Sequence, residues 1–155
     1  QFRQLLGRFA TGVVVLTATE AGGKPVGMTA NSLASGSRNP PLISICVEHK
    51  AADMYHAMTA APEFLINILS ADQEMISRRF AGGNRENRFG GVGYRLSPSG
   101  LVILDGILAY IECERFAQYP LGDHTLFVGR VTGGATGEGR PLLYYRGGYS
   151  ELNQG

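Results

Sequence analysis

Two short polar segments interrupt the apolar runs of this chain and carry side chains that could bind a ligand. The first segment, residues 27–35, gathers hydroxyl and amide groups on Thr29, Asn31, Ser32 and Ser35. The second, residues 122–131, opens on a glycine followed by an Asp-His-Thr triplet. A barrel that only had to fold would have little need for so many hydrogen-bonding groups at the ends of its strands. Together the segments predict a shallow site for a flat ligand rich in nitrogen and oxygen.

The composition excludes several other classes of function. The chain has 155 residues, and we expect a single domain over 1–155. Charged residues make up 17% of the chain and the net charge is +1, which leaves no electrostatic footprint for nucleic acid or a membrane surface. No apolar run approaches the roughly 20 residues of a spanning helix, and no signal peptide is visible, although the chain begins with Gln1. We therefore expect a cytoplasmic protein.

The cysteines and histidines show no metal-ligand pattern. Cys46 and Cys113 lie in two separate strand-like runs without CxxC spacing, and the three histidines are scattered. The sequence predicts two free thiols in a reducing compartment and no metal site.

The segments that must position the polar residues are mostly short and rich in β-branched residues. We predict strands over 13–19, 25–28, 42–47, 64–69, 101–104, 107–116, 125–132 and 142–145. The continuous apolarity of 42–47 favours a strand buried on both faces. Helices are expected over 1–10, 51–59 and 70–80, the last opening with capping-box spacing at Ser70 and Gln73. A polar, glycine-rich loop over 82–93 follows. The pattern favours an antiparallel, closed or partly closed β-barrel with short helices.

With these elements placed, the chain resembles the flavin reductase-like family. The matching segments appear in the family's order and cover nearly the whole chain: FATGVVVLT, GMTANSLAS, PPLISICV, FLINILSADQ, Arg88-Phe89, LAYIECE, GDHTLFVGRV and PLLYYRGGY. The resemblance implies an FMN-binding split β-barrel of Greek-key type that forms a homodimer. It also implies hydride transfer from NADH or NADPH to FMN or FAD, with reduced flavin passing to a separate oxygenase.

The resemblance assigns flavin-binding roles to particular residues of the first segment. The expected contacts come from Met28, Thr29, Ala30, Asn31 and Ser32, with side-chain donors on Asn31 and Ser32 and backbone N–H groups at Thr29 and Ala30. The alternative for this segment is a strand end that satisfies its own backbone through Asx and Ser/Thr turns.

The ribityl and phosphate end of the flavin is expected along a second stretch of the chain. Ser35 and the run 44–50 are expected to line it, with Cys46 contributing its backbone, and the named contacts are Ser35, Cys46, Val47, Lys50, Ala52 and Arg88. Many relatives carry hydroxyl residues where this chain has Ala51-Ala52, which favours loose FMN binding or a different placement of FAD phosphates. A helix N-terminus at this point would still attract phosphate. For Lys50, a solvated surface lysine is an equal alternative.

His124 is the expected catalytic residue, in the sense of positioning rather than proton transfer. Alternation along the strand places it on one face with Leu126, Val128 and Arg130. Asp123 is expected to hold one ring nitrogen while the other meets the ligand. The resemblance implies that this histidine lies close to the flavin and nicotinamide and orients the dinucleotide. Hydride transfer itself needs no acid or base. Tyr149 is expected to contact the nicotinamide and Phe89 the flavin, with packing in the core or a dimer interface as the alternative for Tyr149.

Other functions are still open at this stage. No G-x-G-x-x-G follows a strand, so the chain lacks a Rossmann nicotinamide site. The main alternative to a flavin reductase is an electron carrier of the flavoredoxin type, which keeps its flavin bound. A split-barrel module that binds ligand without redox turnover is the third.

Overall fold

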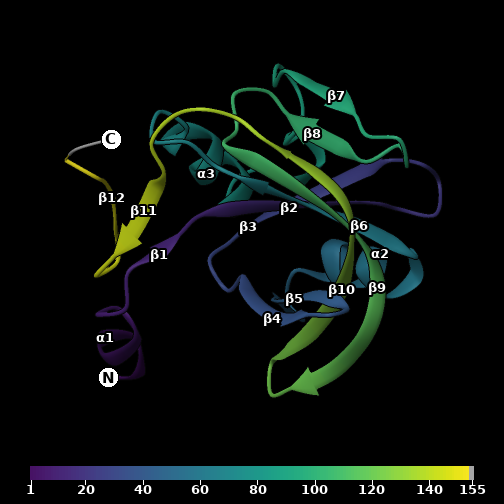
Figure 1. Ribbon diagram of the computed structural model, residues 1–155, viewed down its shortest axis with the longest axis horizontal. Coiled ribbons are helices and arrows are strands. Elements are labelled where there is room, and N and C mark those ends of the chain that lie inside the picture. The colour runs from purple at the N-terminus through teal and green to yellow at the C-terminus, as the bar shows by residue number, and fades with distance from the viewer. Residues whose placement is uncertain (154–155) are drawn as a thin grey trace.

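Strands dominate the computed structural model, which describes residues 1–153 (Figure 1). The helical segments within this range are α1 (Phe2–Leu6), α2 (Ala52–Ala60), α3 (Glu74–Ala81) and the short 3-10 turn η1 (Arg85–Asn87). The strands are β1 (Thr11–Gly12), β2 (Val14–Thr19), β3 (Pro25–Ala30), β4 (Ala34–Arg38), β5 (Pro41–Glu48), β6 (Glu63–Ile68), β7 (Tyr94–Leu96), β8 (Val102–Leu104), β9 (Ala109–Leu121), β10 (His124–Thr136), β11 (Leu142–Tyr145) and β12 (Gly148–Glu151). The last two residues of the predicted domain lie outside the described range.

Seven of these strands form one antiparallel sheet in the order β3-β2-β6-β9-β10-β5-β4. β9 and β10 each span 13 residues and form a long twisted ribbon (Figure 1). The sheet curls far enough for β3 to contact β5, yet among residues 1–153 its edge strands β3 and β4 do not pair. The barrel is therefore split along one side, and the predicted antiparallel, mainly β fold is confirmed.

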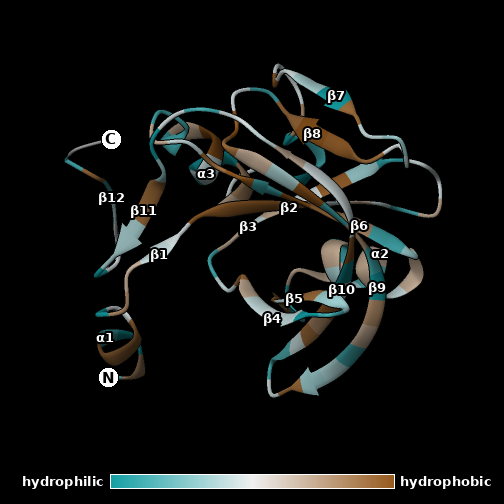
Figure 2. Ribbon diagram, in the orientation of Figure 1, coloured by the Kyte–Doolittle hydropathy of each residue, from teal (hydrophilic) through white to brown (hydrophobic). Residues whose placement is uncertain are grey.

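The core lies on both faces of β2. One cluster packs beneath α2 and includes Leu16, Ile45, Met54, Phe64 and Phe127, each at most 1% exposed. A second cluster lies between β2, α3 and β8 and includes Val15, Phe80 and Leu104. The hydropathy colouring accordingly shows apolar residues along most of β2 and β8 (Figure 2).

β5 differs from the prediction in its burial. Ile43, Ile45 and Val47 are buried, whereas the alternate residues Ser44 and Cys46 are only half-buried. The expectation of burial on both faces is wrong, because one face of β5 packs on the core and the other turns toward the open side of the barrel. This second face carries Cys46 to the edge of a cavity described below.

The sequence reading misses the exposed edge strands β4, β7 and β12, whose composition carries no apolar run. α3 begins at Glu74 rather than at Ser70. Only half of the capping box forms there, with Gln73 Oε1 accepting the Ser70 N–H at 2.9 Å. Ser70 Oγ does not cap the helix: it donates to Asp72 Oδ1 at 2.5 Å and lies 3.1 Å from the Gly106 carbonyl oxygen.

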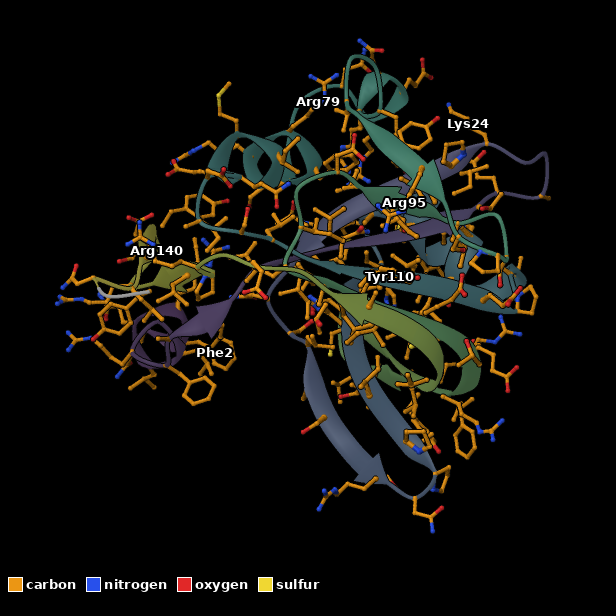
Figure 3. The ribbon with its side chains drawn as sticks, turned by 45° about the horizontal axis from the view of Figure 1, so that its top comes forward. Phe2, Lys24, Arg79, Arg95, Tyr110 and Arg140 are labelled. Carbon is orange, nitrogen blue, oxygen red and sulfur yellow. The ribbon has the colours of Figure 1, made fainter. Side chains whose placement is uncertain are left out.

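α1 is shorter than expected and has no buried residue. Its apolar side chains Phe2, Leu5 and Leu6 are 75%, 64% and 54% exposed, and Phe2 lies at the periphery of the molecule (Figure 3). An isolated five-residue helix has little stability in water, and in the single chain the apolar side chains of α1 stay exposed to solvent.

Residues 1–153 contain neither a membrane-spanning helix nor a cluster of metal-ligating side chains. No helix in that range has the length and apolarity to cross a membrane. The same residues contain no group of three or more His, Cys, Asp or Glu side chains that could hold a metal ion. Cys46 and Cys113 are free thiols, as the sequence predicts.

Candidate functional site

The two polar segments meet at one cavity of about 300 Å³ on the open side of the barrel. It is bounded by the end of β3, the end of β5, the start of α2, the loop 82–93 and the start of β10. Its lining residues are Met28, Thr29, Ala30, Asn31, Ser32, Cys46, Glu48, Ala51, Phe80, Ala81, Arg85, Arg88 and His124. Eight of these are predicted site residues, and their roles toward a ligand stay predictions.

Hydrogen bonds to distant elements hold the segment 28–32 in place. Thr29 Oγ1 donates to the Ser77 carbonyl of α3 at 2.7 Å. Ser32 Oγ accepts the Cys46 N–H of β5 at 3.0 Å. Within residues 1–153 the Asn31 side chain makes no hydrogen bond, and Asn31 is exposed. Two of the three polar side chains thus position the wall, and the Asn31 amide is left available to a ligand.

His124 is the first residue of β10, and a hydrogen bond to its neighbour fixes the orientation of its ring. Gly122 takes a positive φ of 64° in the turn from β9, and the next residue, Asp123, accepts from His124 Nδ1 at 2.7 Å. This hydrogen bond and the charge of His124 lower the pKa of Asp123, so its carboxylate is an acceptor at neutral pH. A proton on Nδ1 leaves Nε2 as the nitrogen available to a ligand. Thr125 and Phe127 are buried, which confirms that His124 lies on the opposite strand face.

Arg79 organises the loop that closes the cavity. Its guanidinium donates to three carbonyls of the loop, those of Asn87, Arg88 and Gly90, at 2.5–2.8 Å. Figure 3 shows Arg79 beside this loop. A single side chain from α3 thereby fixes the backbone on either side of Arg88.

Arg88 is buried and anchors the loop to β3, where the sequence suggested a side chain reaching freely toward phosphate. Its Nη1 donates to the Gly27 carbonyl at 2.8 Å and its Nη2 to the Gly82 carbonyl at 3.2 Å. Nε has no partner in the described residues. Burial and then the charge of Arg85 lower the pKa of Arg88, and Asp53 opposes them. Part of its donor capacity is therefore already used by the protein.

Four of the other predicted residues do not line this cavity. Val47 points into the core and is fully buried, because it alternates with Cys46 along β5. Ser35 lies on β4 opposite Ile43. Lys50 and Ala52 are exposed at the start of α2. The contacts of these four residues with a ligand stay predictions.

Phe89 does not line this cavity either. Its ring packs edge-on against Phe80, with centroids 5.0 Å apart, and against Tyr94 at 6.0 Å. Phe80 lines the cavity, so Phe89 supports the wall rather than forming it. The contact of Phe89 with a flavin stays a prediction.

Tyr149 belongs to a second cavity of about 220 Å³, lined by Val13, Thr29, Ala30, Asn31, Ala81, Tyr144 and Tyr149. Its hydroxyl shares a 2.7 Å hydrogen bond with Ser77 Oγ, and Arg78 lies 4.9 Å from its ring centroid. His124 and Tyr149 therefore line different cavities, which share the Thr29–Asn31 segment as a common wall.

The sequence reading did not assign Glu48, Ala51, Phe80, Ala81 and Arg85 to the site. Arg85 belongs to the predicted polar loop 82–93, and its position there could have indicated a role in the site. Glu48 is opposite His124 in the β5–β10 ladder, a register that no local pattern reveals.

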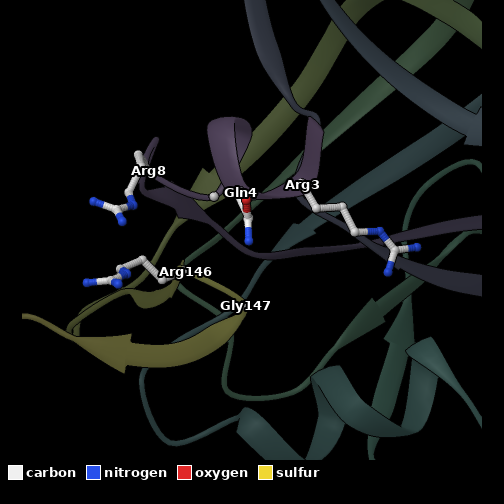
Figure 4. Close-up of a pocket in the computed structure, with 6 residues that line it drawn as sticks. Arg3, Gln4, Arg8, Arg146 and Gly147 are labelled. Carbon is white, nitrogen blue, oxygen red and sulfur yellow. The ribbon is translucent and has the colours of Figure 1, made fainter. Parts of the chain in front are cut away.

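A further cavity of about 500 Å³ lies between α1 and the β11–β12 turn (Figure 4). It is lined by Arg3, Gln4, Gly7, Arg8, Arg146 and Gly147, none of them a predicted site residue. The Arg146 N–H donates to the Gly7 carbonyl at 2.8 Å, which ties the turn to the end of α1. Its lining arginines are exposed, so this hollow carries no converging set of hydrogen-bonding groups like that of the 300 Å³ cavity.

Comparison with known proteins connects this geometry to a family. The model of the flavin reductase like domain matches residues 6–153. The NADH-dependent FMN reductase SmoA of Agrobacterium fabrum is 39% identical over 153 residues, which cover 99% of this chain and 86% of that protein. Two curated relatives from Rhizobium meliloti are 43% and 44% identical, and the chain spans only 47% and 63% of their lengths.

Solved structures agree with the sequence comparison. The NADH:FAD oxidoreductase SgcE6 of Streptomyces globisporus, crystallised with NAD and FAD fragments, superposes with a TM-score of 0.92 at 35% identity, covering 99% of this chain and 92% of that one. A homologue of nitrilotriacetate monooxygenase component B from Mycobacterium thermoresistibile superposes with a TM-score of 0.91 at 37% identity, covering 98% and 85%.

Proposed function

The chain belongs to the flavin reductase-like family, and we propose that it transfers hydride from NADH or NADPH to FMN or FAD. The observation that carries this proposal is the convergence of Asn31 and His124, 93 positions apart in the sequence, on one cavity. The FMN reductase and FAD reductase activities named for the relatives support it.

The residues present fit a flavin. Ala30, Cys46 and Ala51 are small and allow a flat ring to approach the cavity wall closely. The unpartnered Asn31 amide can donate to a ring carbonyl and accept from a ring N–H. A flavin bound there supplies two-electron redox chemistry, for which the protein needs no acid or base of its own. The role of the protein is to bind the flavin and the nicotinamide nucleotide and to orient their rings.

His124 is proposed to orient the nicotinamide through Nε2, because Asp123 holds Nδ1. Hydride transfer requires donor and acceptor atoms about 3–3.5 Å apart, so a small displacement of one ring reduces the rate strongly. Tyr149, in the neighbouring cavity, is proposed as an aromatic surface for the same dinucleotide, since both cavities share Thr29–Asn31.

We propose that the protein is a homodimer that passes reduced flavin to a separate oxygenase component. The exposed apolar side chains of α1 support self-association, because a helix this short needs packing to persist. The name of one structural relative, a monooxygenase component B homologue, supports an oxygenase partner. A cytoplasmic location is proposed from the two free thiols. Light scattering should give twice the monomer mass, and a fully active monomer would contradict the dimer.

A direct assay tests the reductase activity. The protein is mixed with NADH or NADPH and an excess of FMN or FAD, and absorbance at 340 nm is followed. Multiple turnovers of NADH per protein are expected. Flavin that binds but is not reduced by either nucleotide would favour the electron carrier, and absence of flavin binding would favour the non-redox module. His56→Ala is a matched control for His124→Ala, because His56 is exposed on α2 and does not line the cavity.

A further inference from the structure

The N-terminus of α2 opens onto the cavity at Ala51, its N-cap residue. No side chain at the N-cap position accepts a hydrogen bond from the first turn. Free N–H groups and the helix dipole make such an end attractive to an anion. The cavity also receives two arginines, Arg85 and Arg88, from the loop 82–93. A helix N-terminus and two arginines are groups that commonly bind a phosphate.

A carboxylate of the protein already occupies this region. Asp53 Oδ1 accepts the Met54 N–H at 2.8 Å and the Arg85 Nη1 hydrogen at 2.6 Å. The Asp53 side chain is 26% exposed and that of Arg85 40%, so the ion pair is partly screened by water but held in a defined position. Asp53 thus uses the first turn of α2 and the more accessible arginine at once.

Both arginines that line this end of the cavity are therefore already engaged. Arg85 is paired with Asp53, and Arg88 is buried and donates to the carbonyls of Gly27 and Gly82. Glu48, on the cavity lining, adds a second negative charge. Both arginines of the loop are thus engaged by the protein, and two carboxylates oppose a phosphate dianion placed beside them. The binding free energy of an uncharged ring system is not reduced by these carboxylates.

We propose that Asp53 limits the affinity of the site for the phosphate end of a flavin nucleotide, so that the ring system supplies most of the binding free energy. The inference rests on the proposed function and makes the flavin an exchanging substrate. Removing the Asp53 charge weakens the hold on Arg85 and removes the negative charge that repels a phosphate from the first turn of α2, because both contacts are made by one carboxylate oxygen.

The test compares riboflavin, which lacks phosphate, with FMN. Dissociation constants are measured by quenching of flavin fluorescence for the wild type and for Asp53→Asn, which keeps the shape of the side chain. The substitution is expected to tighten FMN about tenfold, or about 1.4 kcal/mol, and to leave riboflavin within about twofold. Arg85→Gln added to Asp53→Asn should abolish the gain, since Arg85 is the group released.

Glu74→Gln is the matched control. Glu74 is also acidic, stands in the first turn of a helix and pairs with an arginine, Arg78, at 2.8 Å, but it does not line the cavity. Both dissociation constants should stay unchanged in this variant. Thermal unfolding of every variant verifies folding, and Asp53→Ser replaces Asp53→Asn if the latter does not fold.

The outcomes separate this inference from the proposed function. Equal changes for riboflavin and FMN in the Asp53 variants, or no change for FMN, would overturn the role of Asp53 while leaving flavin binding intact. A wild type that binds neither riboflavin nor FMN would overturn the proposed function itself. A tenfold gain that survives Arg85→Gln would show that Arg85 is not the released group, which also contradicts the inference.

Discussion

Gly27→Ala is expected to destabilise the protein by displacing a cavity wall. A Cβ at position 27 would lie 2.8 Å from Phe80 Cε1 and 3.1 Å from Phe89 Cζ, whereas ordinary contacts begin at 3.4 Å. The Phe80 ring must move by about 0.6 Å, yet it is completely buried. Overpacking of this kind costs about 1–3 kcal/mol. Alanine lowers the entropy of the unfolded chain, which offsets about 0.4–1 kcal/mol.

The net loss should be about 1–2 kcal/mol, which corresponds to a fall in Tm of about 2–8 °C for a chain of this size. Gly12→Ala is the control, because a Cβ at position 12 has no atom within 4 Å. Its Tm should stay within about 2 °C of the wild type. Calorimetry of both variants measures the difference. FMN affinity should fall only in Gly27→Ala, since Phe80 lines the cavity and the Gly27 carbonyl holds Arg88.

A double-mutant cycle decides whether the Phe80 contact is the cause. Phe80→Leu opens space where the new Cβ would clash, so the double variant should be less destabilised than the two single losses together. Equal Tm values for Gly27→Ala and Gly12→Ala would refute the packing argument. Strict additivity with Phe80→Leu would refute its assignment to this ring.

Three further predictions concern the site. His124→Ala should lower kcat/KM for NADH much more than it weakens flavin binding, because Asp123 holds the ring for the nicotinamide; equal losses would show that the residue is misplaced. Asn31→Ala should weaken flavin binding by about 1–3 kcal/mol, measured by fluorescence titration, since a buried ligand group would lose its partner; an unchanged dissociation constant would remove Asn31 from the site. Iodoacetamide at pH 8 should modify Cys46 slowly and Cys113 not at all in the native protein. Burial raises the pKa of both thiols, but Cys46 is half-buried at the cavity, whereas Cys113 is completely buried and burial and then the charge of Glu112 raise its pKa to about 12. Bound FMN should slow the Cys46 reaction, since Cys46 lines the cavity, and native labelling of Cys113 would contradict the core placement.

The local patterns of the chain are sufficient to identify most of the fold. Alternating and continuous apolar runs predict the bounds of β2, β5, β6 and β11 within one or two residues, because the residues of a strand that face the core must be apolar. The exposed edge strands β4 and β12 are not identifiable in this way, since their neighbours supply the hydrogen bonds and no apolar side chain is needed.

Residue types and their spacing are enough to predict the fold class, the family resemblance and the two polar segments that meet at the cavity. Which of the polar groups are free to bind a ligand depends on the folded arrangement. Thr29 is bound to Ser77, 48 positions away, and Arg85 to Asp53, 32 positions away. Such pairings depend on which distant atoms the folded sheet brings within about 3 Å of each other, and no local pattern of residue types contains that distance.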